Sequence, residues 1–311
     1  MGEFRLVMIS AMYENGGNVV HRHLDGHPQL FVYPFESQLG THWVTDALAS
    51  MFPAKYRWPV FPLEGTPEED FRSIVDEETR VRARTPYVSK FRSVPFEFDD
   101  EERGRLYARY VRENGRSRAE NVRAFFRATF DAWRNFRRTD EQSVYVGYSP
   151  AVVVDTPAIL ADFPDAHVVH VVRNPWSAYA DTKKRPVPLS LDRYMATWCL
   201  VQQHATAFER MYPGRVHLLR YEDVVREPEV VLGSLCRKMG LRPDESLRRP
   251  SWNGEPLEEV FPWGTIRKAT PETNEATARE LSLQERERIT AWAAPWLGKF
   301  GYEDFLGDAE R

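Results

Sequence analysis

Two short groups of residues in the sequence have the chemistry to bind an anion, and the first is a glycine turn. The segment NGGN, residues 15–18, follows an apolar run, and apolar residues then recur at helical spacing from Val19 to Leu24. Backbone N–H groups at the start of a helix lack intrahelical partners, and the helix dipole adds partial positive charge there. A strand, a glycine turn and a helix can therefore hold a phosphate or sulfate. The same arrangement also occurs as a purely structural turn, and the residues alone leave both interpretations open.

The second group is built around an arginine at the end of an apolar strand. Arg173 closes the run His167–Val172 and is followed by Asn174-Pro175. In open α/β sheets ligands bind outside the carboxyl ends of the strands, where an arginine offers a planar fork to a phosphate. An ion pair with a surface carboxylate is the alternative role for Arg173.

The elements that must position these residues alternate along the chain. The apolar runs and helical spacings predict strands at 4–11, 30–33, 144–147, 167–172 and 216–219, and helices at 191–211, 227–239 and 282–292. The uninterrupted apolar run at 167–172 suits a central strand covered on both faces. This alternation predicts an α/β fold with a doubly wound, mostly parallel sheet.

Residues 66–140 differ from the rest of the chain, because charges dominate and apolar residues recur at helical intervals. The spacing predicts two or three amphipathic helices, with Ser117 as a cap. Asp155 is predicted to cap a further short helix that begins with Thr156-Pro157. No linker or internal repeat divides the sequence, so we expect a single domain over residues 1–311 with a helical insertion at about 66–140.

Charge and cysteine content exclude several classes of protein. Lys+Arg 42 against Asp+Glu 46 gives a net charge of −4, which argues against a nucleic-acid partner that is bound through a basic field. Cys199 and Cys236 lie far apart without metal-ligand spacing, so we expect buried thiols rather than a disulfide or a zinc site.

No apolar run approaches the roughly 20 residues of a membrane-spanning helix, and no signal-peptide pattern is present. We therefore expect a cytoplasmic protein with no membrane partner.

At this point the sequence resembles the sulfotransferase family, in particular its bacterial members with a P-loop-type fold. Four segments match the family's motifs in order: ISAMYENGGNVVHRHLDGHPQL (9–30), DTPAILADFPDAHVVHVVRNP (155–175), RYEDVVREPEVVLGSLCRKMGL (220–241) and PWGTIRKATPE (262–272). The resemblance implies transfer of a sulfuryl group from 3′-phosphoadenosine 5′-phosphosulfate (PAPS) to a hydroxyl or amine, without a metal or a covalent enzyme intermediate. The helical insertion has no match, and acceptor specificity would be expected to reside there.

The resemblance also assigns donor-binding residues by position. The 5′-phosphosulfate loop corresponds to Asn15, Gly16, Gly17, Asn18 and Val19. Arg173 would contact the 3′-phosphate, and Asp181 stands eight residues later, where the family usually has a serine. Arg267 and Lys268 would close over the nucleotide.

Glu36, in the segment YPFES after the second strand, is the candidate general base. It stands near the position where related carbohydrate and tyrosylprotein sulfotransferases carry a glutamate, after a one-residue insertion. The alternative is that Glu36 caps a helix beginning near Ser37. His21 and His23 are weaker candidates, since neither matches the histidine motif of the cytosolic branch, and His27 is expected to be structural because it precedes Pro28.

Two further departures from the family pattern concern positive charge. Glu14 and Asp155 stand where the family usually has a lysine or arginine, and like charges beside an anionic donor repel. Lys90 and Arg92 alternate with Phe91, which would place both cations on one side of an extended segment. We hypothesise that one of them replaces the loop cation at the reacting group. The alternative is a pair of solvated surface charges.

Three functions remain open from the sequence. The first is an active sulfotransferase that acts on a small-molecule or carbohydrate acceptor. The second is a PAPS-fold binding protein that is catalytically impaired. The third is a P-loop kinase acting on a small molecule, which the absence of a Gly-Lys-Ser/Thr ending in the glycine loop disfavours.

Overall fold

A five-stranded sheet forms the centre of the computed structural model, which describes residues 4–257 and 269–307. The strands pair in the order β2-β3-β1-β4-β5, and every pairing in this sheet is parallel. Their bounds are β1 (Arg5–Ala11), β2 (Leu30–Val32), β3 (Val144–Tyr148), β4 (His167–Val172) and β5 (Val216–Arg220). The register places Ile9 of β1 beside Tyr148 and Val169. The predicted α/β fold with a parallel sheet is confirmed.

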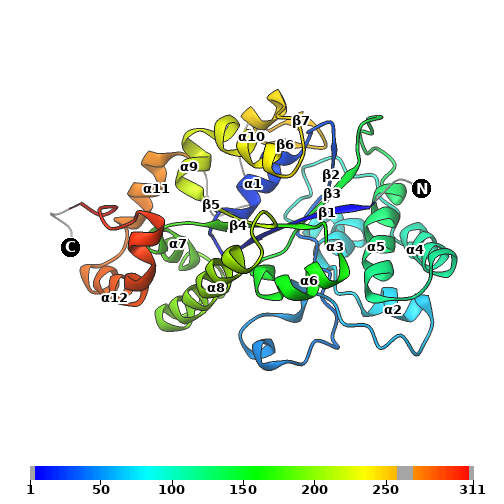
Figure 1. Cartoon of the computed structure of the whole chain (residues 1–311), viewed down its shortest axis with the longest axis horizontal. Helices are drawn as coiled ribbons and strands as arrows, with labels where there is room; N and C mark the ends of the chain where they lie inside the picture. Colours follow the sequence, from blue (N-terminus) through cyan, green and yellow to red (C-terminus); the bar gives the residue numbers. More distant parts are fainter. Residues whose placement is uncertain (1–3, 258–268, 308–311) are drawn as a thin grey trace.

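The sheet is covered on both faces because successive residues of its strands point to opposite sides. Val7 and Ile9 of β1 belong to the core beneath one helical layer, and Leu6 and Met8 belong to the core on the other face. The first layer holds α1 (Gly17–Leu24), α9 (Tyr221–Arg226) and α10 (Pro228–Lys238), and the second holds α6 (Thr156–Asp162) and α8 (Leu191–Met211) (Figure 1).

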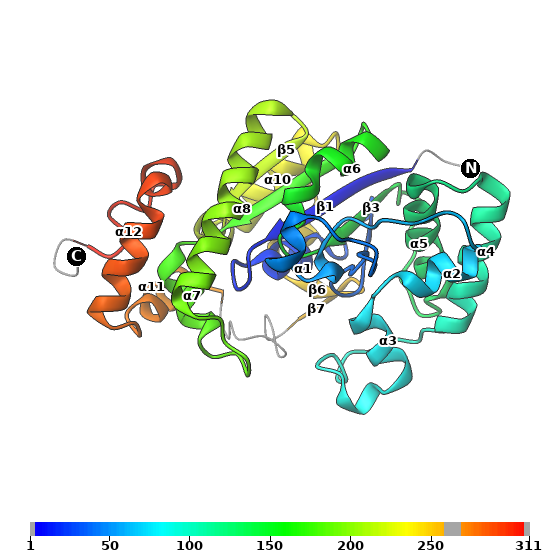
Figure 2. The same ribbon diagram turned by 90° about the horizontal axis from the view of Figure 1, so that it is seen from below.

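The helical insertion between β2 and β3 contains more helices than the sequence predicts. Its α-helices are α2 (Pro67–Ser73), α3 (Glu77–Arg84), α4 (Asp100–Asn114) and α5 (Arg118–Ala132). Ser117 caps α5 as predicted, since its side chain accepts a hydrogen bond from the Glu120 N–H. Figures 1 and 2 show this group at one end of the sheet and α11 (Pro271–Ala278) and α12 (Leu283–Phe300) at the opposite end.

The last helix, α12, extends past the predicted end at Trp292, although Pro295 lies inside it. Ile289, Ala293 and Phe300 recur on one face of this helix and are buried in the core. Tertiary packing of that face therefore outweighs the local cost of the proline.

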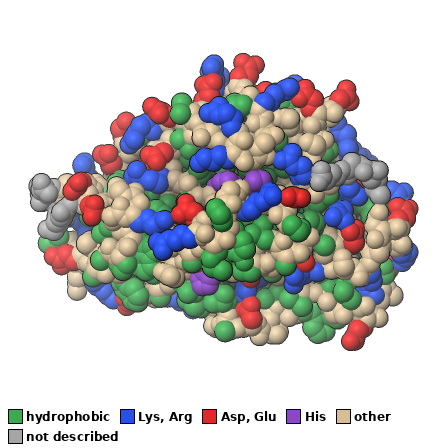
Figure 3. All heavy atoms as spheres, in the orientation of Figure 1, with side chains coloured by type: hydrophobic (Ala, Val, Ile, Leu, Met, Phe, Trp, Pro, Cys, Tyr) green, Lys and Arg blue, Asp and Glu red, His purple; other side chains and the backbone are tan. Residues whose placement is uncertain are grey.

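Both cysteines are buried and free. Burial raises the pKa of the Cys199 thiol to about 12 and that of Cys236 to about 11, so neither ionises readily near neutral pH. Among the residues that the structure describes, no helix is both long and apolar enough to cross a membrane. Basic and acidic side chains are interspersed over the face shown in Figure 3.

Candidate active site

The glycine loop joins the carboxyl end of β1 to α1. Gly16 is the N-cap residue, with a left-handed backbone (φ 84°), and no side chain caps the helix. The Asn15 N–H donates to the Met12 carbonyl at 3.0 Å, which closes the turn before the helix. The Val19 N–H donates to the Gly16 carbonyl at 2.9 Å, whereas the N–H groups of Gly17 and Asn18 have no side-chain acceptor among the described residues, as an anion site requires.

Asn15 holds the loop in place through its side chain. Its amide nitrogen donates to the Tyr13 carbonyl at 2.9 Å and to the Tyr194 hydroxyl at 3.0 Å. Its amide oxygen accepts from the Arg173 N–H at 3.1 Å and from the Trp198 indole at 3.2 Å. These contacts occupy the buried side chain, so the loop would contact an anion through its backbone.

Two tyrosines explain why the loop carries paired glycines. A Cβ on Gly16 would lie 2.2 Å from the ring of Tyr221, and a Cβ on Gly17 would lie 2.5 Å from the ring of Tyr148. Any larger residue at either position would therefore displace a buried ring. The Tyr221 hydroxyl is itself buried and has no hydrogen-bond partner among the described residues.

Arg173 lies at the end of β4, as predicted, but its charge is already paired inside the protein. Its side chain is 1% exposed, and Nη1 lies 2.8 Å from Oδ2 of Asp181, whose side chain is 3% exposed. Nη1 also donates to the Glu14 carbonyl at 2.9 Å, and Nε donates to Asn274 at 2.7 Å. The ion pair with a carboxylate that the sequence offered as the alternative is therefore present, but its partner is buried and not at the surface.

Glu36 lies on the segment that follows β2 and continues beside β3. Pro34 has no N–H to extend the strand, and Ser37 then donates its N–H to the Tyr148 carbonyl at 2.6 Å. Residues 37–40 are not helical, so the hypothesis that Glu36 caps a helix there is wrong. Because Tyr148 packs on Gly17 and also holds Ser37, Glu36 is anchored beside the glycine loop.

The helical insertion brings a second carboxylate to Glu36, which the sequence did not indicate. Glu78 of α3 accepts a hydrogen bond from the Glu36 N–H at 3.3 Å and forms an ion pair with Lys90. Gln38 strengthens this junction, since its amide oxygen accepts from the Glu77 N–H at 2.7 Å and its amide nitrogen donates to Glu36 at 3.5 Å.

Burial and like charge shift the ionisation of this group. Burial raises the pKa of Glu78 to about 7, the negative charge of Glu36 adds to the rise, and the cation of Lys90 opposes it. Burial also raises the pKa of the Tyr13 phenol to about 12, an effect that Arg185 opposes and Glu36 reinforces. Glu36, Glu78 and Tyr13 therefore share one electrostatic environment at the loop.

A cavity of about 270 Å³ opens beside Glu78 and Lys90. Its lining mixes paired charges with apolar side chains: Gln38, Lys55, Glu77, Glu78, Val81, Val88, Ser89, Lys90 and Phe91. Since all these residues except Gln38 and Lys55 come from the insertion, the insertion forms most of the wall of this cavity.

Lys90 and Arg92 do not lie in an extended segment, so the predicted alternation is wrong. Residues 90–93 form a turn in which Ser89 Oγ accepts the Phe91 N–H at 3.1 Å. Phe91 is buried against Phe35, with ring centroids 4.4 Å apart. Lys90 consequently points to Glu78, whereas Arg92 is exposed and forms no side-chain ion pair in the part of the chain that the structure describes.

The two other carboxylates that depart from the family pattern have cationic neighbours. Asp155 does not cap α6 as predicted, because both its oxygens accept from Arg57 at 2.7 and 2.8 Å. Glu14 lies 3.9 Å from Nε of Arg185, whose guanidinium stacks over Tyr13. Neither carboxylate faces the loop as an unpaired charge.

The three histidines of the first segment have structural surroundings. His21 is buried against Arg22, and burial holds its pKa well below the usual range. His23 lies 2.8 Å from the Leu247 carbonyl, and His27 lies 3.0 Å from that of Arg242. Arg267 and Lys268, the predicted closing residues, lie outside the described residues.

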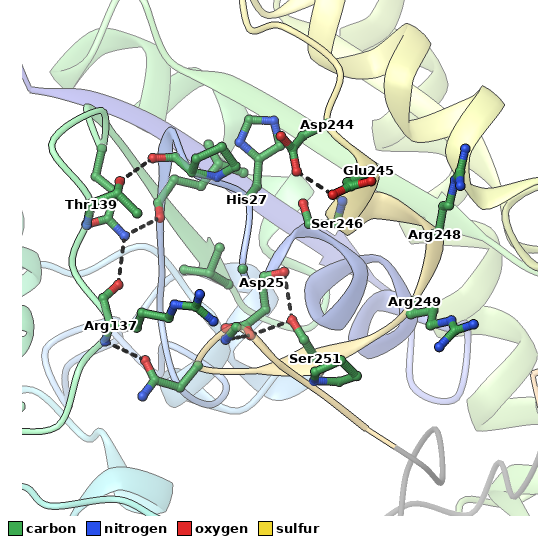
Figure 4. A pocket seen from close by; sticks show the side chains of 18 of the residues that line it. Asp25, His27, Arg137, Thr139, Asp244, Glu245, Ser246, Arg248, Arg249 and Ser251 are labelled. Carbon is green, nitrogen blue, oxygen red and sulfur yellow. Dashed lines mark hydrogen bonds between the residues drawn. The ribbon is translucent and has the colours of Figure 1, made fainter.

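A second cavity, of about 630 Å³, lies away from the glycine loop, past the carboxyl end of α1 and at the start of β2 (Figure 4). Asp25 and Ser251 are hydrogen-bonded to one another at 2.8 Å on its wall, whereas Arg248 and Arg249 point away from them. Within residues 4–257 and 269–307, no group of three or more His, Cys, Asp or Glu residues could hold a metal ion.

Together, the fold and the loop define an α/β protein with a parallel sheet and an uncapped glycine turn between its first strand and first helix. The chain belongs to the sulfotransferase family, whose family model matches residues 15–245. The family and the transferase activity expected from the sequence are thereby confirmed.

Solved structures show the same fold. The sulfotransferase domain of the olefin synthase of Synechococcus PCC 7002 is 16% identical, with a TM-score of 0.55 over 94% of this chain and 95% of that domain. The sulfotransferase domain from the curacin biosynthetic pathway is also 16% identical, with a TM-score of 0.53 over 94% of this chain and 99% of that domain. No curated protein sequence matches the chain.

Proposed function

We propose that this sulfotransferase moves a sulfuryl group from PAPS to a hydroxyl or amine of a small-molecule or carbohydrate acceptor by in-line displacement. One observation carries the proposal. Tyr148 packs its ring on Gly17 at the uncapped start of α1 and holds Ser37 through its carbonyl, which sets Glu36 beside the loop. Tyr148 thus joins the proposed anion site to the proposed carboxylate base.

The donor supplies the sulfuryl group and a phosphate leaving group, and the chain's own residues bind, orient and deprotonate. The loop backbone from Asn15 to Val19 suits the 5′-phosphosulfate end, because its helix start is uncapped. Arg173, with Asp181 beside it, would meet the 3′ end of the nucleotide, and Arg267 and Lys268 would close over it.

On the acceptor side, Glu36 takes the proton from the attacking hydroxyl or amine. Lys90 is the cation that we assign to the charge on the bridging oxygen, because it reaches Glu78 and hence the Glu36 backbone, whereas Arg92 points to solvent. The cavity beside them would hold the acceptor, and we invoke no metal ion.

Two measurements test this proposal together. The first compares thermal stability with 3′-phosphoadenosine 5′-phosphate (PAP) and with ATP–Mg²⁺; PAP at about 100 times its dissociation constant should add roughly 2.7 kcal/mol. The second incubates the protein with labelled PAPS and a panel of alcohols, phenols, amines and carbohydrates. A larger shift with ATP–Mg²⁺ would favour a kinase, and PAP binding without transfer to any acceptor would favour an impaired binding protein.

A further inference from the structure

The ion pair between Arg173 and Asp181 occupies the place where the proposed donor would present its 3′ end. The two side chains are 1% and 3% exposed, and they lie 2.8 Å apart at the end of β4. Asp181 belongs to α7 (Pro175–Thr182), which begins directly after that strand, so the carboxylate is fixed to the same rigid unit as the arginine. The ion pair is therefore a buried, fixed part of the fold and not a solvent-exposed contact.

The charged side chains around the ion pair do not release Arg173 from Asp181. The second oxygen of Asp181 lies 2.9 Å from Nζ of Lys184, and the same ammonium lies 2.9 Å from Glu280. Burial lowers the pKa of the Arg173 guanidinium, but the neighbouring Tyr221, Asp181 and buried Glu222 outweigh that effect and raise the pKa. Arg173 thus remains charged, but acidic side chains around it balance that charge.

We propose that Asp181 competes with the donor's 3′-phosphate for Arg173, so that this protein distinguishes only weakly between nucleotides with and without a 3′-phosphate. The inference rests on the proposed function. A 3′-phosphate must share the guanidinium with a carboxylate that repels it, or displace that carboxylate from a desolvated site. A nucleotide with a free 3′-hydroxyl leaves the pair intact, since a hydroxyl can donate to a carboxylate.

The test compares the dissociation constants of PAP and AMP, which differ only by the 3′-phosphate, by titration calorimetry. The wild-type protein should prefer PAP by less than about tenfold, which is below the roughly 10- to 150-fold that one hydrogen bond to a charged group contributes. Asp181→Asn keeps the shape and removes the charge, and it should raise that preference by about tenfold or more. Asp181→Glu keeps the carboxylate and should leave the preference low. Glu280→Gln is the matched control, because Glu280 contacts Lys184 and has no ion pair with Arg173.

Three outcomes are decisive. A wild-type preference for PAP above a hundredfold, or an unchanged preference in a folded Asp181→Asn protein, would overturn the inference and leave the proposed function standing. If Asp181→Asn does not fold, the wild-type ratio alone decides. Failure of both PAP and AMP to bind the wild-type protein would refute the proposed function, and the inference with it.

Discussion

The backbone N–H of Glu36 donates a hydrogen bond to Oε2 of Glu78 at 3.3 Å. This contact joins the segment after β2, which carries the proposed base, to α3 of the helical insertion. Lys90 pairs with the same Glu78 side chain, so the insertion supplies both an acid and a cation to the site. Most of the proposed acceptor site consequently belongs to one structural unit, the helical insertion.

The first prediction concerns the pH dependence of stability. The pKa of Glu78 is about 7 in the folded protein against 4.5 ordinarily, so the folded state binds more protons in that range. Its contribution is fully present below about pH 4.5 and is lost as the pH rises through 7. The free energy of unfolding of the wild-type protein should fall by up to roughly 3 kcal/mol relative to Glu78→Gln between pH 5 and pH 8. Denaturant unfolding of both proteins checks this, and parallel pH profiles would contradict it.

The second prediction separates the two insertion cations. Lys90→Met should keep its PAP affinity and lose roughly 3 kcal/mol of transition-state stabilisation, which is about a hundredfold in rate. Arg92→Met, two residues away and exposed, should transfer at a near-native rate. Steady-state rates with PAP titrations of each variant are the measurement. Near-native rates in both variants would return Lys90 to the role of a surface charge.

The third prediction tests the glycine loop. Gly16→Ala combines a positive φ with a clash against Tyr221, whereas Gly214→Ala has a similar φ of 78° and open space around its Cβ. Both variants should pay about 1–2 kcal/mol for the backbone, and Gly16→Ala should lose a further 1–3 kcal/mol to overpacking. Denaturant unfolding should resolve the difference, and PAP binding should weaken in Gly16→Ala alone. Equal losses in the two proteins would mean that Tyr221 moves aside freely.

Much of the fold could be predicted because its signals are local. The helix α8 has the predicted bounds, Leu191–Met211, since its apolar residues recur at helical spacing over 21 residues. The strands were predicted because runs such as His167–Val172 are apolar without interruption. The extra helices of the insertion were harder, because short charged helices such as α3 depend on tertiary contacts more than on their own periodicity.

The candidate site was less predictable, because its partners are distant in sequence. The local sequence predicts that Asp155 caps a helix, but Arg57, 98 residues away, donates hydrogen bonds to both of its carboxylate oxygens. Glu78 showed no local signal, since only the folding of α3 onto Gln38 brings it to Glu36. The orientation of the Lys90 side chain depends on the burial of Phe91 against Phe35, and sequence spacing alone does not predict that contact.

The most direct test of the central claim is the rate of sulfuryl transfer from labelled PAPS by Glu36→Gln, compared with the wild-type protein at saturating donor and acceptor. Glutamine keeps the shape of the side chain but cannot accept the acceptor's proton, so the rate should fall by about 10²–10⁴-fold while PAP affinity is unchanged. Glu113→Gln, an exposed glutamate on α4 that does not line the proposed acceptor cavity, serves as the control and should retain its activity. A Glu36→Gln protein that transfers within a few-fold of the wild-type rate would contradict the account.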